Sequence, residues 1–166
     1  LNNRQEEARS FRSTFAKRKK PNILVVSRGH GSYINEEDQK YLIESTCQVI
    51  HEQLNNYNLF VKKHPREKNS HWDKLLEDYP SIKIVEDHVL DIATKVDFAI
   101  TFWSSAAMEC VNLGVPVIEF YDPNKYSKQQ IFEGDPFTTI YRKLGLVHAA
   151  DDKKELFEVV AGILKR

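Results

Sequence analysis

Apolar residues along this chain occur in short runs that alternate with longer amphipathic stretches. The clearest run covers Ile23 to Val26 and lies between Pro21 and Gly29. An uninterrupted apolar run bounded by such residues is typical of a parallel strand that is buried on both faces. By the same criteria, strands are predicted at residues 22–27, 58–63, 82–85, 97–101, 115–120 and, briefly, 146–148.

The stretches between these runs carry apolar residues three and four positions apart, which predicts helices. Asn35 is expected to cap the first of them, Asp151 the last, and Gly114 is expected to end one in the left-handed conformation. The predicted helices cover residues 36–56, 70–78, 90–95, 104–113, 125–132, 136–144 and a final stretch that ends at residue 164.

This alternation of strands and helices indicates the α/β class: a Rossmann-like, doubly wound parallel sheet of five to six strands with helices on both faces. In such sheets, ligands bind at the carboxyl ends of the strands, beside the switch in strand order. The residues that follow each strand are therefore the candidates for a binding site.

The first 20 residues differ in composition from the remainder. Ala8, Phe11 and Phe15 have helical spacing, a basic run follows at residues 17–20, and Pro21 should end the helix. We expect a basic linker helix at 1–20 and one nucleotide-binding domain at 21–166. The basic side chains form either a solvated helix face or a patch that associates peripherally with an anionic membrane surface.

Composition narrows the function classes. The 166 residues include 24 basic and 24 acidic groups, and this balance argues against a nucleic-acid partner. Cys47 and Cys110 lie in apolar helical patterns, so we expect free, buried thiols and a reducing, cytoplasmic location, extending to the inner face of the membrane. The sequence has no apolar run of about 18 residues and no visible signal peptide. Because it begins with Leu1, we expect it to be part of a longer protein.

Polar residues follow the first two predicted strands. Arg28, Gly29, His30 and Gly31 come after the first strand, where glycines let the backbone approach a ligand and the basic side chains suit phosphate. A plain turn explains the same residues, because the dinucleotide fingerprint G-x-G-x-x-G is absent.

The second strand ends at Lys63 and His64, followed by Pro65, which favours an extended conformation at His64. An imidazole held in this way can donate a charge-assisted hydrogen bond to phosphate.

The third and fourth predicted strands end in a second group of polar residues. Glu86 and His88 follow the third strand, where backbone groups can read the edge of a base. Ser104 and Ser105 follow the fourth strand, and Ser104 suits the N-cap of the next helix. Such a helix start favours phosphate. Glu109 is four residues beyond Ser105, on the same helix face, where its carboxylate suits ribose hydroxyls.

Other site classes are poorly supported. The six histidines and two cysteines have no metal-ligand spacing, and neither a G-x-S-x-G nucleophile motif nor a Walker A loop occurs. No metal and no cofactor is therefore expected, apart from a nucleotide-linked substrate.

The order His64-Pro65, then Ser104-Ser105, then Glu109-x-x-x-x-Gly114-x-Pro116 resembles the C-terminal, donor-binding half of GT-B glycosyltransferases. It is most similar to bacterial surface-polysaccharide enzymes with HP and SS motifs: sialyltransferases, capsule Kdo transferases and CDP-glycerol polymerases. The resemblance covers roughly residues 22–120. It implies half of a GT-B fold and a CMP- or CDP-linked donor.

Carried over by residue, the resemblance implies that His64, Ser104 and Ser105 bind the donor phosphate, with Arg28 and Lys63 beside them. Glu109, with Glu86 and His88, would bind ribose and base, while Gly29, His30 and Gly31 would form a loop beside the donor. The resemblance also implies an N-terminal domain, outside this chain, that binds a glycan or lipid-linked acceptor and supplies the general base. The catalytic residue is therefore not identified.

Two alternatives remain open. A non-hydrolysing UDP-sugar 2-epimerase shares the architecture, although its comparable turn is normally glycine-rich with two adjacent acids, where this chain has Trp103, Ser104, Ser105 and the single Glu109. A non-catalytic nucleotide-binding module would keep the same pocket without performing a reaction.

Overall fold

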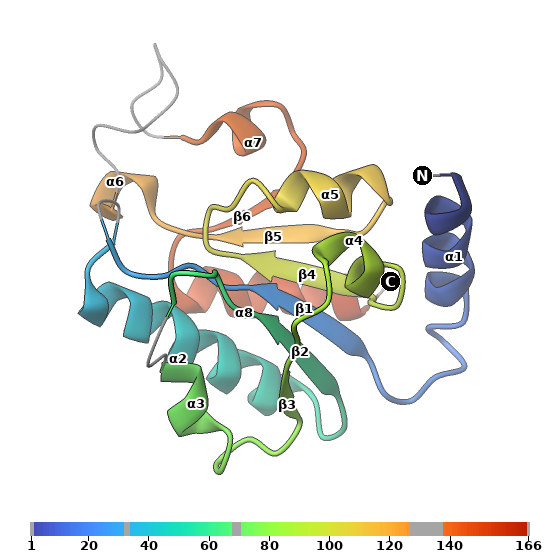
Figure 1. Cartoon of the computed structure of the whole chain (residues 1–166), viewed down its shortest axis with the longest axis horizontal. Helices are drawn as coiled ribbons and strands as arrows, with labels where there is room; N and C mark the ends of the chain where they lie inside the picture. Colours follow the sequence, from blue (N-terminus) through green and yellow to red (C-terminus); the bar gives the residue numbers. More distant parts are fainter. Residues whose placement is uncertain (1, 32–33, 68–70, 127–137, 166) are drawn as a thin grey trace.

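A computed structural model describes residues 2–31, 34–67, 71–126 and 138–165 of the chain. Its centre is a six-stranded sheet in which every neighbouring pair of strands is parallel (Figure 1). The predicted fold class, a Rossmann-like α/β sheet, is confirmed. The strands are β1 (Asn22–Val26), β2 (Asn58–Lys62), β3 (Ile82–Ile84), β4 (Phe98–Thr101), β5 (Val117–Phe120) and β6 (His148–Ala150).

The strand order β3-β2-β1-β4-β5-β6 sets the position of the site. The chain moves outward from β1 to β3 and then crosses back to place β4 on the other side of β1. The switch in strand order therefore lies between β1 and β4, where Val26 is in register with Thr101. Loops diverge at such a switch, which leaves a crevice at the carboxyl ends of the two strands.

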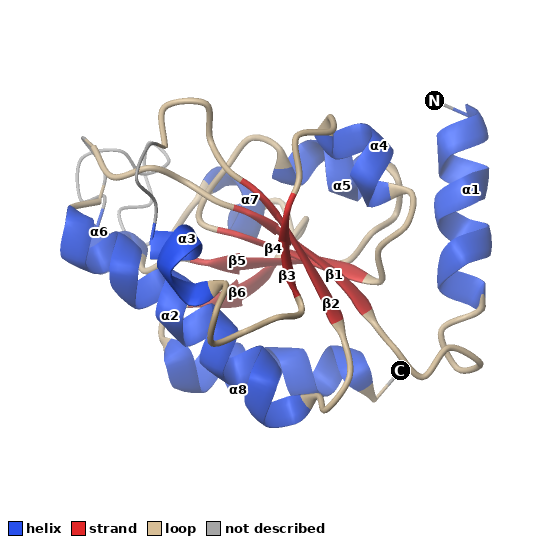
Figure 2. Ribbon diagram, turned by 60° about the horizontal axis from the view of Figure 1, so that its bottom comes forward, coloured by secondary structure: helices blue, strands red, loops and turns tan. Residues whose placement is uncertain are grey.

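One face of the sheet is covered by α2 (Glu36–Gln53), α3 (His71–Leu75) and α8 (Lys153–Leu164) (Figure 2). Leu42 and Ile43 of α2 and Leu156 of α8 are fully buried against alternate residues of the strands. This layer holds the larger part of the core, and it includes Cys47 as a buried free thiol.

The opposite face is covered by α4 (Val89–Ala93) and α5 (Ala107–Asn112), with α1 (Asn2–Ser13) packed outside α4. Leu24 of β1 and Ala99 of β4 face this layer, which also buries Cys110. Both faces of β1 and β4 are thus covered, which explains why these strands are continuously apolar.

Helix ends follow the predicted chemistry in most places. Asn35 accepts a hydrogen bond from the backbone N–H of Asp38, and Gly114 has a φ of 73°. Two backbone bonds surround this glycine, from Gly114 to the carbonyl of Val111 and from Val115 to that of Cys110, which together form a Schellman motif. The last helix differs from the prediction, since its N-cap is Asp152 and not Asp151.

The N-terminal segment packs against the domain. Its helix ends at Ser13, earlier than Pro21 suggested, and a turn follows at residues 14–17. Arg18 then forms an ion pair with Asp97 at 2.5 Å, and Ala8 is fully buried. Aliphatic burial and this ion pair together hold the segment against α4 and the start of β4.

The last third of the chain departs most from the predicted boundaries. Between β5 and β6 the described residues include two single-turn helices, α6 (Pro123–Tyr126) and α7 (Ile140–Lys143). The predicted helix at 125–132 falls largely on residues 127–137, outside the described residues. Of the helix predicted at 136–144, residues 136 and 137 lie outside the described residues, and the remainder contains the shorter α7. Ser70 of the predicted helix 70–78 is also outside the described residues. The predicted strand at 146–148 was placed too early, because Gly145 first ends α7 with a φ of 69°.

Candidate functional site

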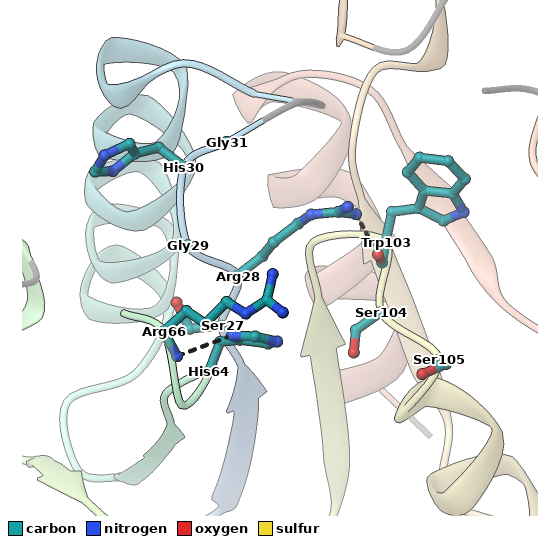
Figure 3. Close-up of a pocket in the computed structure, with 10 residues that line it drawn as sticks. All are labelled: Ser27, Arg28, Gly29, His30, Gly31, His64, Arg66, Trp103, Ser104 and Ser105. Atoms are coloured by element: carbon teal, nitrogen blue, oxygen red, sulfur yellow. Dashed lines mark hydrogen bonds between the residues drawn. The ribbon is translucent and has the colours of Figure 1, made fainter. Parts of the chain in front are cut away.

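A cavity of about 410 Å³ lies at the carboxyl ends of β1, β2 and β4, beside the switch in strand order (Figure 3). It is formed by the three segments that immediately follow these strands. The lining residues are Ser27, Arg28, Gly29, His30, Gly31, His64, Arg66, Trp103, Ser104 and Ser105. The imidazole of His64 and the paired serines therefore share one hollow, as the sequence predicted.

His64 enters this cavity from the end of β2. Its Nδ1 atom accepts a hydrogen bond of 3.1 Å from the backbone N–H of Arg66, in the tight turn made by Pro65. Because Nδ1 is an acceptor, the ring proton of the neutral imidazole lies on Nε2. Figure 3 shows the ring extending across the cavity towards Ser104. The turn thus presents a hydrogen-bond donor to the interior of the cavity.

The two serines lie on the opposite wall, after β4. The Oγ of Ser104 accepts from the backbone N–H of Ala106 at 3.2 Å. The helix itself begins only at Ala107, so the predicted helix start at Ser104 was three residues too early. Ser104 and Ser105 occupy a turn whose carbonyls accept from Ala107 and Met108. Short side chains in this turn leave backbone and hydroxyl groups close to the cavity.

Arg28 spans the crevice between β1 and β4. Its Nη1 donates to the backbone carbonyl of Trp103 at 2.7 Å, and its guanidinium carbon lies 5.2 Å from the centre of the Trp103 ring. Trp103 has a φ of 58°, the left-handed region that a bulky residue rarely adopts. This conformation belongs to the sharp turn between β4 and the serines. Arg28 therefore holds one wall of the cavity against the other.

The electrostatic character of the cavity is cationic. Two guanidinium groups, on Arg28 and Arg66, line it together with the imidazole of His64. Among the described residues that line it, none carries a carboxylate. Fixed donors and positive charge in a partly enclosed hollow favour an anionic ligand.

Beyond Arg28, the loop after β1 contributes mainly backbone to the cavity. His30 directs its imidazole away from the cavity, where its Nδ1 lies 3.4 Å from Oε1 of Gln39 on α2 (Figure 3). Gln39 in turn donates to the carbonyl of Arg28 at 2.9 Å. A Cβ on Gly29 would make only ordinary contacts, and one on Gly31 would meet open space. The absence of a side chain at these two positions leaves room at the cavity, although a Cβ could be accommodated at either of them.

Lys63 does not line the cavity. Strand alternation turns it to the other side from His64, and its Nζ lies 3.6 Å from a carboxylate oxygen of Asp73 on α3. The structure therefore does not place Lys63 beside the predicted phosphate-binding residues His64, Ser104 and Ser105.

Glu86, His88 and Glu109 form a separate group, outside the residues that line the cavity. The carbonyl of Glu86 accepts from Nζ of Lys62 at 2.7 Å. His88 caps α4 by accepting the N–H of Leu90 at its Nδ1, 3.9 Å from Oε2 of Glu109. Because Nδ1 of His88 accepts this hydrogen bond, it carries no proton, and its proximity to Glu109 is not an ion pair. It does place the two predicted ribose- and base-binding side chains next to each other.

Three lining residues were absent from the predicted set: Ser27, Arg66 and Trp103. Ser27 and Trp103 adjoin predicted residues in sequence, and Arg66 is two residues beyond His64, so the strand-end rule could have found all three. The sequence does not show which way a side chain points. Lys63 and Arg66 both lie within two residues of His64, and only Arg66 faces the cavity.

Two other site classes find no support in the part of the chain that the structure describes. No group of three or more histidine, cysteine, aspartate or glutamate side chains is arranged to hold a metal ion there. Among the helices within these residues, none has the length and apolar character needed to cross a membrane.

Comparison with known proteins places the fold and the family. A family model described as CDP-Glycerol:Poly(glycerophosphate) glycerophosphotransferase matches residues 28–165. No curated protein sequence matches the chain significantly.

Among solved structures, the chain is similar to a UDP-GlcNAc 2-epimerase from Methanocaldococcus jannaschii in complex with UDP-GlcNAc and UDP, with 18% identity and a TM-score of 0.62. That match covers 95% of this chain and 42% of the epimerase. A variant of the wall teichoic acid polymerase TagF has 15% identity and a TM-score of 0.61 over 97% of this chain and 40% of its own. The Kdo transferase KpsC from Thermosulfurimonas dismutans has 16% identity and a TM-score of 0.50 over 95% and 55%.

These solved structures share the fold with this chain. The chain spans about two fifths of the epimerase and of the polymerase, and about half of the Kdo transferase.

Proposed function

Because the chain belongs to the CDP-glycerol:poly(glycerophosphate) glycerophosphotransferase family, we propose that it is the donor-binding domain of a transferase that uses a cytidine nucleotide-linked donor. The description of this family names a CDP-linked substrate. A TagF structure that was soaked with CDPG has the same fold, with 16% identity and a TM-score of 0.52 over 97% of this chain. The family description supports CDP as the donor nucleotide, whereas solved structures with this fold include both one soaked with CDPG and one in complex with UDP.

The observation that carries the proposal is the shared cavity of His64, Ser104 and Ser105 at the switch in strand order. A diphosphate needs several donors arranged around one hollow, and these residues provide them from two opposite walls. Arg28 and Arg66 add positive charge between the walls.

The same geometry supports a role in the transfer step. When a bond to the donor phosphate breaks, negative charge grows on the departing nucleotide. Donors that are already oriented stabilise this charge without reorganisation, which is a large part of catalysis in such sites. The Nε2–H of His64 and the hydroxyls of Ser104 and Ser105 are the groups proposed for this task.

Glu109, with Glu86 and His88, is proposed to bind the ribose and base. Glu109 and His88 approach within 3.9 Å of each other beside the start of α4 and α5. A carboxylate and a histidine Nε2 in this arrangement can pair with two neighbouring hydroxyls. The nucleoside would then extend from the cavity towards α4.

The acceptor is proposed to bind to a second domain. The chain spans only part of its structural relatives, and a transferase needs a surface that faces the donor. We propose a glycan or lipid-linked acceptor of bacterial surface polysaccharide synthesis, with the general base supplied by that second domain.

The test is binding of CDP, CMP, UDP and inorganic pyrophosphate, measured by isothermal titration calorimetry. CDP should bind more tightly than UDP, and pyrophosphate should compete with it. His64→Ala and Ser104→Ala should each weaken CDP binding by about tenfold, because each removes one hydrogen bond to a charged group.

Two exposed positions provide matched controls. His51→Ala on α2 and Ser13→Ala at the end of α1 change the same residue types outside the cavity, and CDP binding should be unaffected. Tighter binding of UDP than CDP would favour the epimerase-like alternative. Loss of CDP binding in the control variants, or its absence in the unmodified chain, would reject the proposal.

A further inference from the structure

Directly behind the cavity lies a carboxylate that the site so far does not use. Glu67 follows the His64-Pro65-Arg66 turn, and only 7% of it is exposed. A buried carboxylate is costly unless its oxygens accept hydrogen bonds. Its contacts therefore show what it holds in place.

Both oxygens of Glu67 accept hydrogen bonds from the ends of two neighbouring strands. Oε1 accepts the backbone N–H of His64 at 3.3 Å, and Oε2 accepts the hydroxyl of Ser27 at 3.0 Å. The backbone N–H of Glu67 also donates to the carbonyl of His64 at 2.8 Å. The carboxylate thus joins the end of β1 to the turn that presents the imidazole.

A residue of α3 determines which way the hydroxyl of Ser27 donates. Nε1 of Trp72, a fully buried side chain, donates to Oγ of Ser27 at 2.8 Å. Since that oxygen accepts from Trp72, the proton of Ser27 points to Glu67. Hydrogen bonds arranged in such a chain polarise and strengthen one another.

We infer that Glu67 is a positioning residue for donor binding, which acts by holding the His64 turn so that Nε2–H faces the cavity. This inference rests on the proposed function for its ligand, but the geometry it describes exists without one. Glu67 lies outside the residues that line this cavity and borders an adjoining one. Its carboxylate holds Ser27 and the backbone of His64, and of these two His64 presents the ring N–H to the ligand, so we expect its effect on an anionic ligand to pass mainly through His64.

A double-mutant cycle tests this dependence. Glu67→Gln keeps the size of the side chain and loses the charge, and it should weaken CDP binding about tenfold in the otherwise unmodified chain. In the His64→Ala background, the same substitution should change CDP binding less than twofold, because the group that it positions is gone. Equal losses in both backgrounds would overturn the inference, since they would indicate a merely structural role.

A second variant covers the case in which Glu67→Gln fails to fold. Trp72→Phe keeps a buried ring and removes the N–H that orients Ser27, without touching the cavity. It should weaken CDP binding several-fold, again only when His64 is present. Glu52→Gln, at an exposed position of α2, is the control and should leave CDP binding unchanged.

A measurement without ligand separates this inference from the proposed function. Nitrogen-15 chemical shifts of the His64 ring report its tautomer directly. At pH 8 the unmodified chain and the Glu52→Gln control should show the Nε2–H form, and Glu67→Gln should show a mixture of tautomers. An unchanged Nε2–H form in Glu67→Gln would overturn the role of Glu67, whereas failure of the unmodified chain to bind CDP would reject only the proposed function.

Discussion

At the scale of single residues, the site combines an unusual backbone with ordinary side chains. Trp103 adopts a left-handed conformation at the point where β4 turns into the serine segment. For a residue with a Cβ this conformation costs about 1–2 kcal/mol. Its surroundings compensate: the carbonyl accepts from Arg28, and the ring centre lies 5.2 Å from that of Tyr121. The backbone strain at Trp103 is therefore offset by contacts that Trp103 itself makes in the cavity wall.

The positive φ of Trp103 predicts that a glycine variant is more stable than an alanine variant, the reverse of the usual order. Both Trp103→Ala and Trp103→Gly remove the ring and should destabilise the domain. Trp103→Gly should nevertheless be the more stable of the two by about 1 kcal/mol, because only glycine adopts the positive φ without cost. Urea denaturation measures the difference. An alanine variant equal to or more stable than the glycine variant would show that this turn carries no backbone strain.

At the scale of elements, the short helix α5 is held by its ends. It has six residues, too few for a stable isolated helix, and its C-terminus is closed by the Schellman motif at Gly114. Arg12 from α1 donates to the carbonyl of Leu113, so the same cap also contacts the N-terminal helix. The cap of α5 thus orders the element that follows the two serines.

Two glycine substitutions should have opposite effects on stability. Gly114→Ala should destabilise the domain by about 1–2 kcal/mol, because φ is positive and the new Cβ would lie 3.0 Å from Nη2 of Arg12. Gly162→Ala, within α8 and with open space around its Cβ, should stabilise it by about 0.5–1 kcal/mol. Thermal and urea unfolding of both variants provide the comparison. Destabilisation by Gly162→Ala of the same size would show that the effect is unrelated to φ.

The docking of the N-terminal segment provides a second prediction at this scale. Arg18→Ala should cost about 2 kcal/mol of the free energy of unfolding, because the buried carboxylate of Asp97 loses both hydrogen bonds from the guanidinium and keeps the one from the backbone N–H of Asn22. Arg4→Ala breaks the half-exposed pair with Asp91 and should cost about 0.5 kcal/mol or less. Equal losses in the two variants, measured by urea denaturation, would contradict an ordering by burial.

At the scale of the whole molecule, the sheet separates two apolar layers, and each layer contains one cysteine. Cys47 lies in the layer of α2 and α8, and Cys110 in that of α4 and α5. Burial raises the pKa of each thiol to about 12. Both are therefore protonated and unreactive in the folded domain near neutral pH. Thiol reactivity thus reports on the opening of each layer separately.

A thiol-specific reagent at pH 8 should label neither cysteine in the native domain and both after unfolding in urea. If the domain unfolds as one cooperative unit, the two thiols should be labelled at the same rate under mildly denaturing conditions. Faster labelling of Cys110 would show that the layer of α4 and α5 opens independently.

The same pKa shifts determine the effect of alkaline pH. A thiol in the unfolded chain has a pKa of about 8.5, so it ionises while the folded thiol remains neutral. The stability from the neutral thiols is complete below about pH 8 and falls as pH rises towards 12. Replacing both cysteines with alanine should reduce this alkaline loss, which urea titrations at pH 7 and 10 would measure.

The amino-acid sequence by itself determined the class of fold and the edge of the sheet that carries the site. Uninterrupted apolar runs, Pro21 and Gly114 define buried parallel strands and helix ends through local physics, and parallel strands bring their carboxyl ends to one edge. His64 and the pair Ser104 and Ser105 could therefore be assigned to one hollow, although they lie far apart in the chain.

Only the tertiary structure decided the direction of side chains and the contacts between distant segments. Lys63 pairs with Asp73 while Arg66 faces the cavity, and Glu67 reaches both Ser27 and the backbone of His64. Such choices depend on which partner is within reach once the strands have been packed. Local sequence patterns contain no information on that distance, and so the positioning network behind the imidazole became visible only in three dimensions.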